Sequence, residues 1–164
     1  MATPTYTLID SVTLASSAAS VTFSSIDQSY GDLVLVMQTK SAGTSAWLQF
    51  NNSSSGYNHV YMAGNGSSAS SSSASNQSGL FLQDVAYTLS SEFSLIIVNI
   101  MDYSATDKNT SVLVRNNTPS LGTEAFAGRW ANNSAVNSVK LTSQYGTVYD
   151  AGTNLHLYGI AKAL

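Results

Sequence analysis

The sequence predicts an all-β protein, an antiparallel, jelly-roll-like β-sandwich of about 8–11 strands in a single domain covering residues 1–164. Short stretches rich in Val, Leu, Ile, Thr, Tyr and Phe alternate with Gly, Ser, Asn and Asp clusters, at the spacing of roughly 8–12 residues typical of sandwiches. No segment of about ten residues shows the apolar period of a helix. Both prolines, Pro4 and Pro119, lie outside the strand-like stretches, as strand pairing requires.

Eleven stretches carry the strand pattern, and the sixth is the weakest of them. In chain order they are Tyr6–Leu14, Ser20–Ser25, Leu33–Thr39, Ala46–Asn51, Tyr57–Met62, Gly79–Gln83, Phe93–Met101, Ser111–Arg115, Glu124–Trp130, Ser138–Thr142 and Asn154–Ala161. In the first stretch Leu8, Val12 and Leu14 share one face. In the tenth, Val139 and Leu141 alternate with polar residues, the pattern of a sheet with one buried face.

Two stretches are continuously apolar, 33–37 and 95–98. A central strand of a two-layer sandwich has only one face covered by the opposite sheet. Because these strands are apolar on both faces, we expect their second face to be covered as well. Another subunit or the chain's own loops would both supply that cover, and the pattern does not choose between them.

Two segments depart from the strand pattern. Residues 64–79 are low in complexity and nearly devoid of large side chains, which predicts an exposed flexible Ser/Gly-rich loop. The alternative is a contact loop that orders on binding. Residues 1–5 predict an extended N-terminal arm that is stiffened by Pro4.

The amino-acid composition excludes several classes of function. Charged residues make up 9% of the chain, against about 25% in ordinary soluble domains. The net charge is −3 and the six Lys and Arg residues are scattered, so we expect no nucleic-acid binding. Cysteine is absent, which removes disulfides and thiolate chemistry. No apolar run approaches about 18 residues, so we expect no membrane span.

The residues that carry chemistry are few and dispersed. His59 and His156 are the only histidines, and no serine lies in a Gly-x-Ser-x-Gly motif. Asp102 and Asp107 flank a turn where they could share a calcium ion, although turn formation explains them more simply. We therefore expect no catalytic, cofactor-binding or metal-ligating residues, and a protein that is not an enzyme.

The fifth stretch contains the pattern that most suggests a binding surface. In a strand, Tyr57, His59 and Tyr61 project to one face. Aromatic planes complement the C–H faces of sugars, so this face is a candidate glycan contact. The alternative is a strand whose aromatic face packs against the neighbouring sheet.

The C-terminal residues resemble a known group of proteins. The closing hairpin of many tailed-phage structural proteins, those of cyanophages included, looks like Ser134–Thr142, a turn, and then Asp150–Ile160 of this chain. Those proteins end in a strand with the sequence Leu-Tyr-Gly-Ile, which this chain has at Leu157-Tyr158-Gly159-Ile160. The Gly64-Asn65-Gly66-Ser67-Ser68 loop and Gly128-Arg129-Trp130 are also similar to that group.

The resemblance implies a virion structural protein made in the host cytoplasm and located on the capsid surface. Its first implied role is a capsid decoration (cement) protein, a homotrimer that binds the major capsid protein and stabilises the shell. The alternative is a receptor- or glycan-binding module of a tail or head fibre. The candidate partner contacts are Thr3, Pro4, Thr5 and Tyr6 of the arm, together with Tyr57, His59 and Tyr61.

Overall fold

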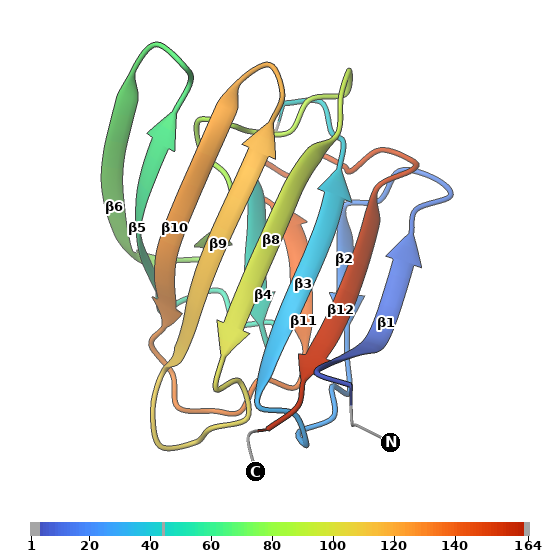
Figure 1. Cartoon of the computed structure of the whole chain (residues 1–164), viewed down its shortest axis with the longest axis vertical. Coiled ribbons are helices and arrows are strands. Elements are labelled where there is room, and N and C mark those ends of the chain that lie inside the picture. Colours follow the sequence, from blue (N-terminus) through green and yellow to red (C-terminus); the bar gives the residue numbers. More distant parts are fainter. Residues whose placement is uncertain (1–3, 44, 163–164) are drawn as a thin grey trace.

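The computed structural model describes residues 4–43 and 45–162, and it confirms the predicted all-β sandwich. Within these residues there are twelve strands, no helix and two antiparallel sheets (Figure 1). The strands are β1 (Tyr6–Thr13), β2 (Ser20–Phe23), β3 (Asp32–Thr39), β4 (Ala46–Phe50), β5 (Tyr57–Gly64), β6 (Ala69–Gln77), β7 (Leu80–Phe81), β8 (Ser94–Met101), β9 (Thr110–Thr118), β10 (Gly122–Trp130), β11 (Val139–Ser143) and β12 (Asn154–Ile160). All eleven expected stretches became strands, and β6 is the addition.

The two sheets differ in width. The large sheet has eight strands in the order β1-β12-β3-β8-β9-β10-β5-β6, and the small sheet has four in the order β2-β11-β4-β7. The small sheet lies behind the middle of the large one, and β6 forms the free edge next to β5 (Figure 1). The large sheet therefore has an inner face, toward the small sheet, and an outer face. The two-sheet sandwich does not by itself establish a jelly-roll order of connections between the strands, so the jelly roll stays a prediction.

The core lies between the inner faces of the two sheets. Alternate residues of β3, β8 and β12 point inward and are fully buried, among them Leu35, Val98 and Leu157. They pack against side chains of the small sheet such as Leu48 and Val139. Burying a large aliphatic side chain stabilises a fold by roughly 1.5–3 kcal/mol, so this layer supplies much of the folding free energy.

The prediction of a flexible loop at residues 64–79 is wrong for most of that segment, because residues 69–77 form β6. β6 pairs antiparallel with β5, in regular register from Gly64↔Ala69 to His59↔Ala74. None of its side chains is buried, so it forms through main-chain hydrogen bonds to β5 rather than through a hydrophobic face. Composition alone pointed to a loop because it reports burial and not the availability of a neighbouring strand.

A close packing contact explains the glycine of the C-terminal Leu-Tyr-Gly-Ile segment. Gly159 lies on the inner face of β12, and the ring of Tyr30 lies directly on it. A Cβ atom at position 159 would stand 2.4 Å from Cγ of Tyr30 and 2.5 Å from Cδ2. No side chain larger than hydrogen fits there unless the ring moves.

We therefore expect Gly159→Ala to destabilise the protein by about 1–3 kcal/mol, because overpacking displaces the Tyr30 ring. Urea unfolding followed by tryptophan fluorescence measures the loss. The matched control is Gly64→Ala, where the nearest atom to a new Cβ is 3.9 Å away. Equal stabilities of the two variants would contradict this account of Gly159.

Candidate functional site

The aromatic face of β5 points into the sandwich rather than toward solvent. Tyr57, His59 and Tyr61 do share one face, as alternation predicted, but it is the inner face. Tyr57 is fully buried and His59 is 5% exposed, while Tyr61 is half-buried. The interpretation of these residues as a surface for sugar stacking is therefore wrong for Tyr57 and His59, and the packing alternative is the one observed.

Aromatic packing holds Tyr57 in place. Its ring stacks on Trp130 at a centroid distance of 6.2 Å and lies 6.1 Å from the ring of Phe50. Its hydroxyl oxygen accepts a hydrogen bond from the Phe50 backbone N–H at 2.6 Å. Burial raises the pKa of Tyr57 to about 12, so the hydroxyl is neutral at physiological pH.

His59 lies among aromatic rings in the same layer. Its ring centroid is 4.7 Å from that of Phe81 and 5.8 Å from that of Phe126. The buried Nδ1 atom has no hydrogen-bond partner among the described residues. Burial lowers the pKa of His59, and the negative charge of Asp84 opposes that effect only in part.

The N-terminal candidates lie beside the C-terminal strand. The carbonyl of Thr5 accepts a hydrogen bond from Ala161 N–H at 3.1 Å, and Tyr6 begins β1 opposite Ile160. Pro4 and Tyr6 are exposed. Thr3 and the rest of the expected arm before Pro4 lie outside the described residues, so the role of the arm stays a prediction.

A buried carboxylate cluster lies under β9 and β10. Glu124 is buried, and its carboxylate accepts hydrogen bonds from the backbone N–H groups of Asp84 and Val85 and from the Asn116 side chain at 2.8 Å. The Tyr61 hydroxyl donates to the Asp84 carboxylate, and this bond raises the pKa of Tyr61 to about 12. Both acids thus fasten the segment that follows β7 to the large sheet.

We expect Glu124→Gln to lower the free energy of unfolding by about 2–4 kcal/mol, because an amide replaces one acceptor oxygen with a donor that faces backbone N–H groups. Urea unfolding measures the loss. The control is Glu92→Gln, which changes a less buried carboxylate bonded to Ser120 and should lose less than about 1 kcal/mol. Equal losses of unfolding free energy in the two variants would contradict the inference that Glu124 holds the segment after β7 to the large sheet.

His59 should make stability fall in mild acid. Its folded pKa lies below the unfolded value of about 6.5, so the unfolded state takes up the proton first. This contribution is fully present above pH of about 6.5 and is lost as the pH falls toward the lowered folded pKa. The measurement is the unfolding free energy at pH 7.5 and at pH 5.5. We expect this free energy to fall less between the two pH values in His59→Leu than in the wild-type chain. An unchanged decrease would assign the pH dependence to other groups.

The outer face of the large sheet carries several exposed apolar side chains. Val60 and Met62 of β5 occupy the positions between the aromatic residues and point outward, and Met62 is 68% exposed. Leu113 of β9 is 48% exposed, and Leu95 of β8 is also exposed. The sequence led us to expect a cover on the second faces of 33–37 and 95–98. The described part of the chain buries Val34 on the second face of 33–37 but leaves Leu95 exposed, so a cover from another subunit over Leu95 stays a prediction.

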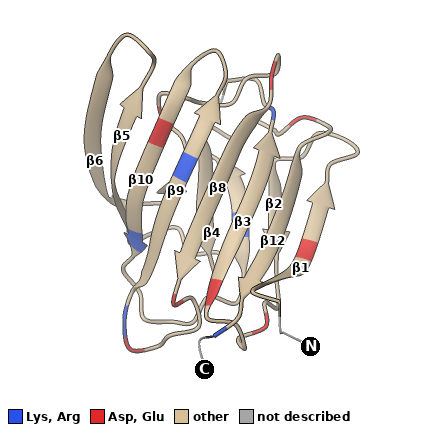
Figure 2. Cartoon of the chain, viewed as in Figure 1, with Lys and Arg blue, Asp and Glu red and all other residues tan. Residues whose placement is uncertain are grey.

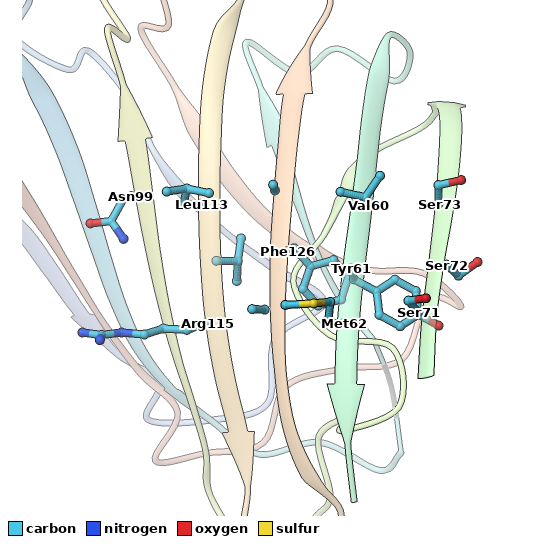
Figure 3. Close-up of a pocket in the computed structure, with 13 residues that line it drawn as sticks. Val60, Tyr61, Met62, Ser71, Ser72, Ser73, Asn99, Leu113, Arg115 and Phe126 are labelled. Carbon is cyan, nitrogen blue, oxygen red and sulfur yellow. The ribbon is translucent and has the colours of Figure 1, made fainter. Parts of the chain in front are cut away.

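Val60, Met62 and Leu113 border a groove along β10. Ala125 and Ala127 form its floor, because their strand β10 lies between β5 and β9. Figure 3 shows Val60 and Met62 on one side of β10 and Leu113 on the other. We call this feature the outer groove. Ser71 and Ser73 of β6 line its margin. Its volume is about 1070 Å³, slightly above the range of roughly 300–1,000 Å³ for small-molecule pockets, and it is open along the sheet.

Charge is sparse around the outer groove. Figure 2 shows few Lys, Arg, Asp or Glu residues on the large sheet. Arg115, exposed on β9, lines the groove beside Asn99. The outer groove is therefore apolar and carries one guanidinium, which suits a partner with apolar side chains and a carboxylate.

The remaining sequence candidates have local partners. Asp102 forms an ion pair with Lys108 at 3.1 Å, and its backbone N–H donates to Asp32. In the part of the chain that the structure describes, no group of three or more His, Asp or Glu side chains is placed to hold a metal ion. His156 shares a face with Tyr158, as expected, at a ring distance of 6.4 Å.

Sequence reasoning selected the wrong face of β5. It chose the tyrosines and the histidine for their chemistry and passed over Val60 and Met62. The signal that would have located the groove was the small pair Ala125 and Ala127, set between strands with outward aliphatic residues.

Comparison with models of known protein families finds no match to this chain, and comparison with curated protein sequences finds none either. Within residues 4–43 and 45–162, no helix has the length and apolar character needed to cross a membrane.

Proposed function

We propose that this protein is a non-catalytic structural protein of a virion, a capsid decoration protein that binds the major capsid protein through its outer groove. The observation that carries the proposal is the exposed apolar groove on an otherwise weakly charged sheet. Contiguous exposed apolar surface is one of the features of sites that bind other proteins or ligands, whereas isolated exposed apolar side chains are common everywhere. The resemblance of the C-terminal hairpin to tailed-phage structural proteins supplies the class of partner.

The physical properties of the large sheet suit adhesion to a shell. β5, β10 and β9, which carry the floor and the apolar sides of the groove, are each hydrogen-bonded to a strand on both sides, so little conformational entropy is lost there when a partner binds. The floor residues Ala125 and Ala127 allow apolar side chains of the partner to approach the sheet closely. Arg115 would pair with a carboxylate on the capsid protein and set the register of binding.

The glycan-binding alternative has lost its main sequence argument. It depended on Tyr57, His59 and Tyr61 as a surface, and the structure turns that face inward. Protein binding through the outer groove is therefore the function that the geometry supports best.

The test uses particles of the virus that encodes this chain, prepared without it and then incubated with the purified protein. Quantitative mass spectrometry should find hundreds of copies per particle. We expect Leu113→Glu to reduce occupancy at least tenfold, because a carboxylate in the apolar contact must lose its hydration and would also compete for Arg115, which together weaken the interface by more than about 1.4 kcal/mol.

The control is Tyr145→Glu, which places the same charge on an exposed aromatic in the turn after β11 of the small sheet. It should leave occupancy unchanged. Occupancy of a few tens of copies would favour a fibre module, and equal effects of the two variants would remove the outer groove from the proposal.

A further inference from the structure

The free edge at β6 differs from the other edges of the two sheets. An edge strand presents unpaired backbone N–H and C=O groups, and proteins usually protect such edges with short strands, bulges, charges or proline. Three of the four edges here are protected by short strands or by a charge together with an irregularity. β2 has four residues and β7 has two, while β1 contains Asp10 and a register irregularity between Leu8 and Asp10.

β6 has none of these protections over most of its length. It has nine residues, contains no proline and no charged residue, and pairs in regular register with β5 from Ala69 to Ala74. Only the irregularity between Tyr57 and His59 of β5 interrupts the pairing, near the end of β6. From Ala69 to Ala74 its outer edge is therefore a regular row of hydrogen-bonding groups that matches another β-strand.

The burial of β6 also indicates a missing neighbour. Seven of its nine side chains are exposed and the other two, Ala74 and Gln77, are half-buried. Ordering such a strand costs about 1–2 kcal/mol of backbone entropy per residue, and no buried apolar side chain offsets that cost. A second strand on its free edge would add main-chain hydrogen bonds where few side-chain contacts exist.

We propose that this neighbour is β6 of a second copy of the chain, paired antiparallel about a twofold axis. Charge is the reason for choosing a second copy. A twofold axis places identical strands together, so charged residues near its centre would meet their own like charges. The sequence contains no Asp, Glu, Lys or Arg between Lys40 and Asp84, which covers β4 to β7.

Edge pairing would join the two large sheets into one continuous sheet. Ser71 and Ser73, which line the margin of the outer groove, would lie next to their counterparts, so the two grooves would face the same side. The pair would be a dimer, whereas the resemblance to decoration proteins implies a trimer. This inference does not rest on the proposed function, and its test needs no viral particle.

The first test is the mass of the purified chain in solution, by sedimentation velocity and native mass spectrometry. We expect a dimer of the 17.2 kDa chain at micromolar concentration. The double variant Ser71→Lys/Ser73→Lys places like charges beside the twofold axis and should raise the dimer dissociation constant at least tenfold. Ser11→Lys/Thr13→Lys puts the same charges on the exposed outer side of the β1 edge and should leave the constant unchanged.

The second test uses the absence of native cysteine. Single variants Ser70→Cys, Ser71→Cys, Ser72→Cys and Ser73→Cys should form intermolecular disulfides most efficiently at one position, with yields falling on either side, because only residues near the twofold axis have Cβ atoms close enough. Ser11→Cys is the control and should not cross-link.

A monomer at tens of micromolar, a trimer, or a dimer that the β6 lysines leave intact would overturn the inference. So would cross-linking at Ser11→Cys equal to that at the β6 positions. Cross-linking of β6 only to a different protein on viral particles would overturn it too, and would assign the edge to that partner.

Discussion

Apolar side chains on the inner faces of the two sheets bury one another, and this packing decides which residues of the central strands of the large sheet point inward. Because side chains alternate along a strand, burial of Leu35 and Leu157 on one face sends their neighbours to the other. The same constraint turns Tyr57 and His59 inward and leaves Val60 and Met62 outside. The location of the candidate site is thus a consequence of core packing.

The unequal widths of the sheets create the surfaces that we interpret functionally. Four strands cannot cover eight, so the β5–β6 end of the large sheet extends past the middle that the small sheet backs. Beneath this end the chain uses polar anchors. Glu124 holds the backbone of Asp84 and Val85, and Tyr61 binds Asp84. These bonds fix the segment after β7 and so support the strands that carry the outer groove.

The low charge content acts on both the groove and the edge. Around the outer groove it leaves apolar side chains with Arg115 as the local charge, and along β6 it leaves serine hydroxyls and main-chain groups. Charged side chains normally keep such surfaces apart from other proteins. Their scarcity here suits a molecule that acts by shape and contact, in agreement with the dispersed titratable groups.

The sequence by itself determined the fold class and the position of eleven strands, because β-branched and aromatic stretches between turn residues carry their signal locally. It also identified Tyr57, His59 and Tyr61 as one face of a strand, since alternation is a property of the backbone. The tertiary structure alone decided which face of β5 is buried, that Glu124 meets Asp84, and that serines 70–73 form a strand. Each of these depends on a partner far away in the chain, a neighbouring strand or an opposing sheet, and local patterns contain no information about that partner.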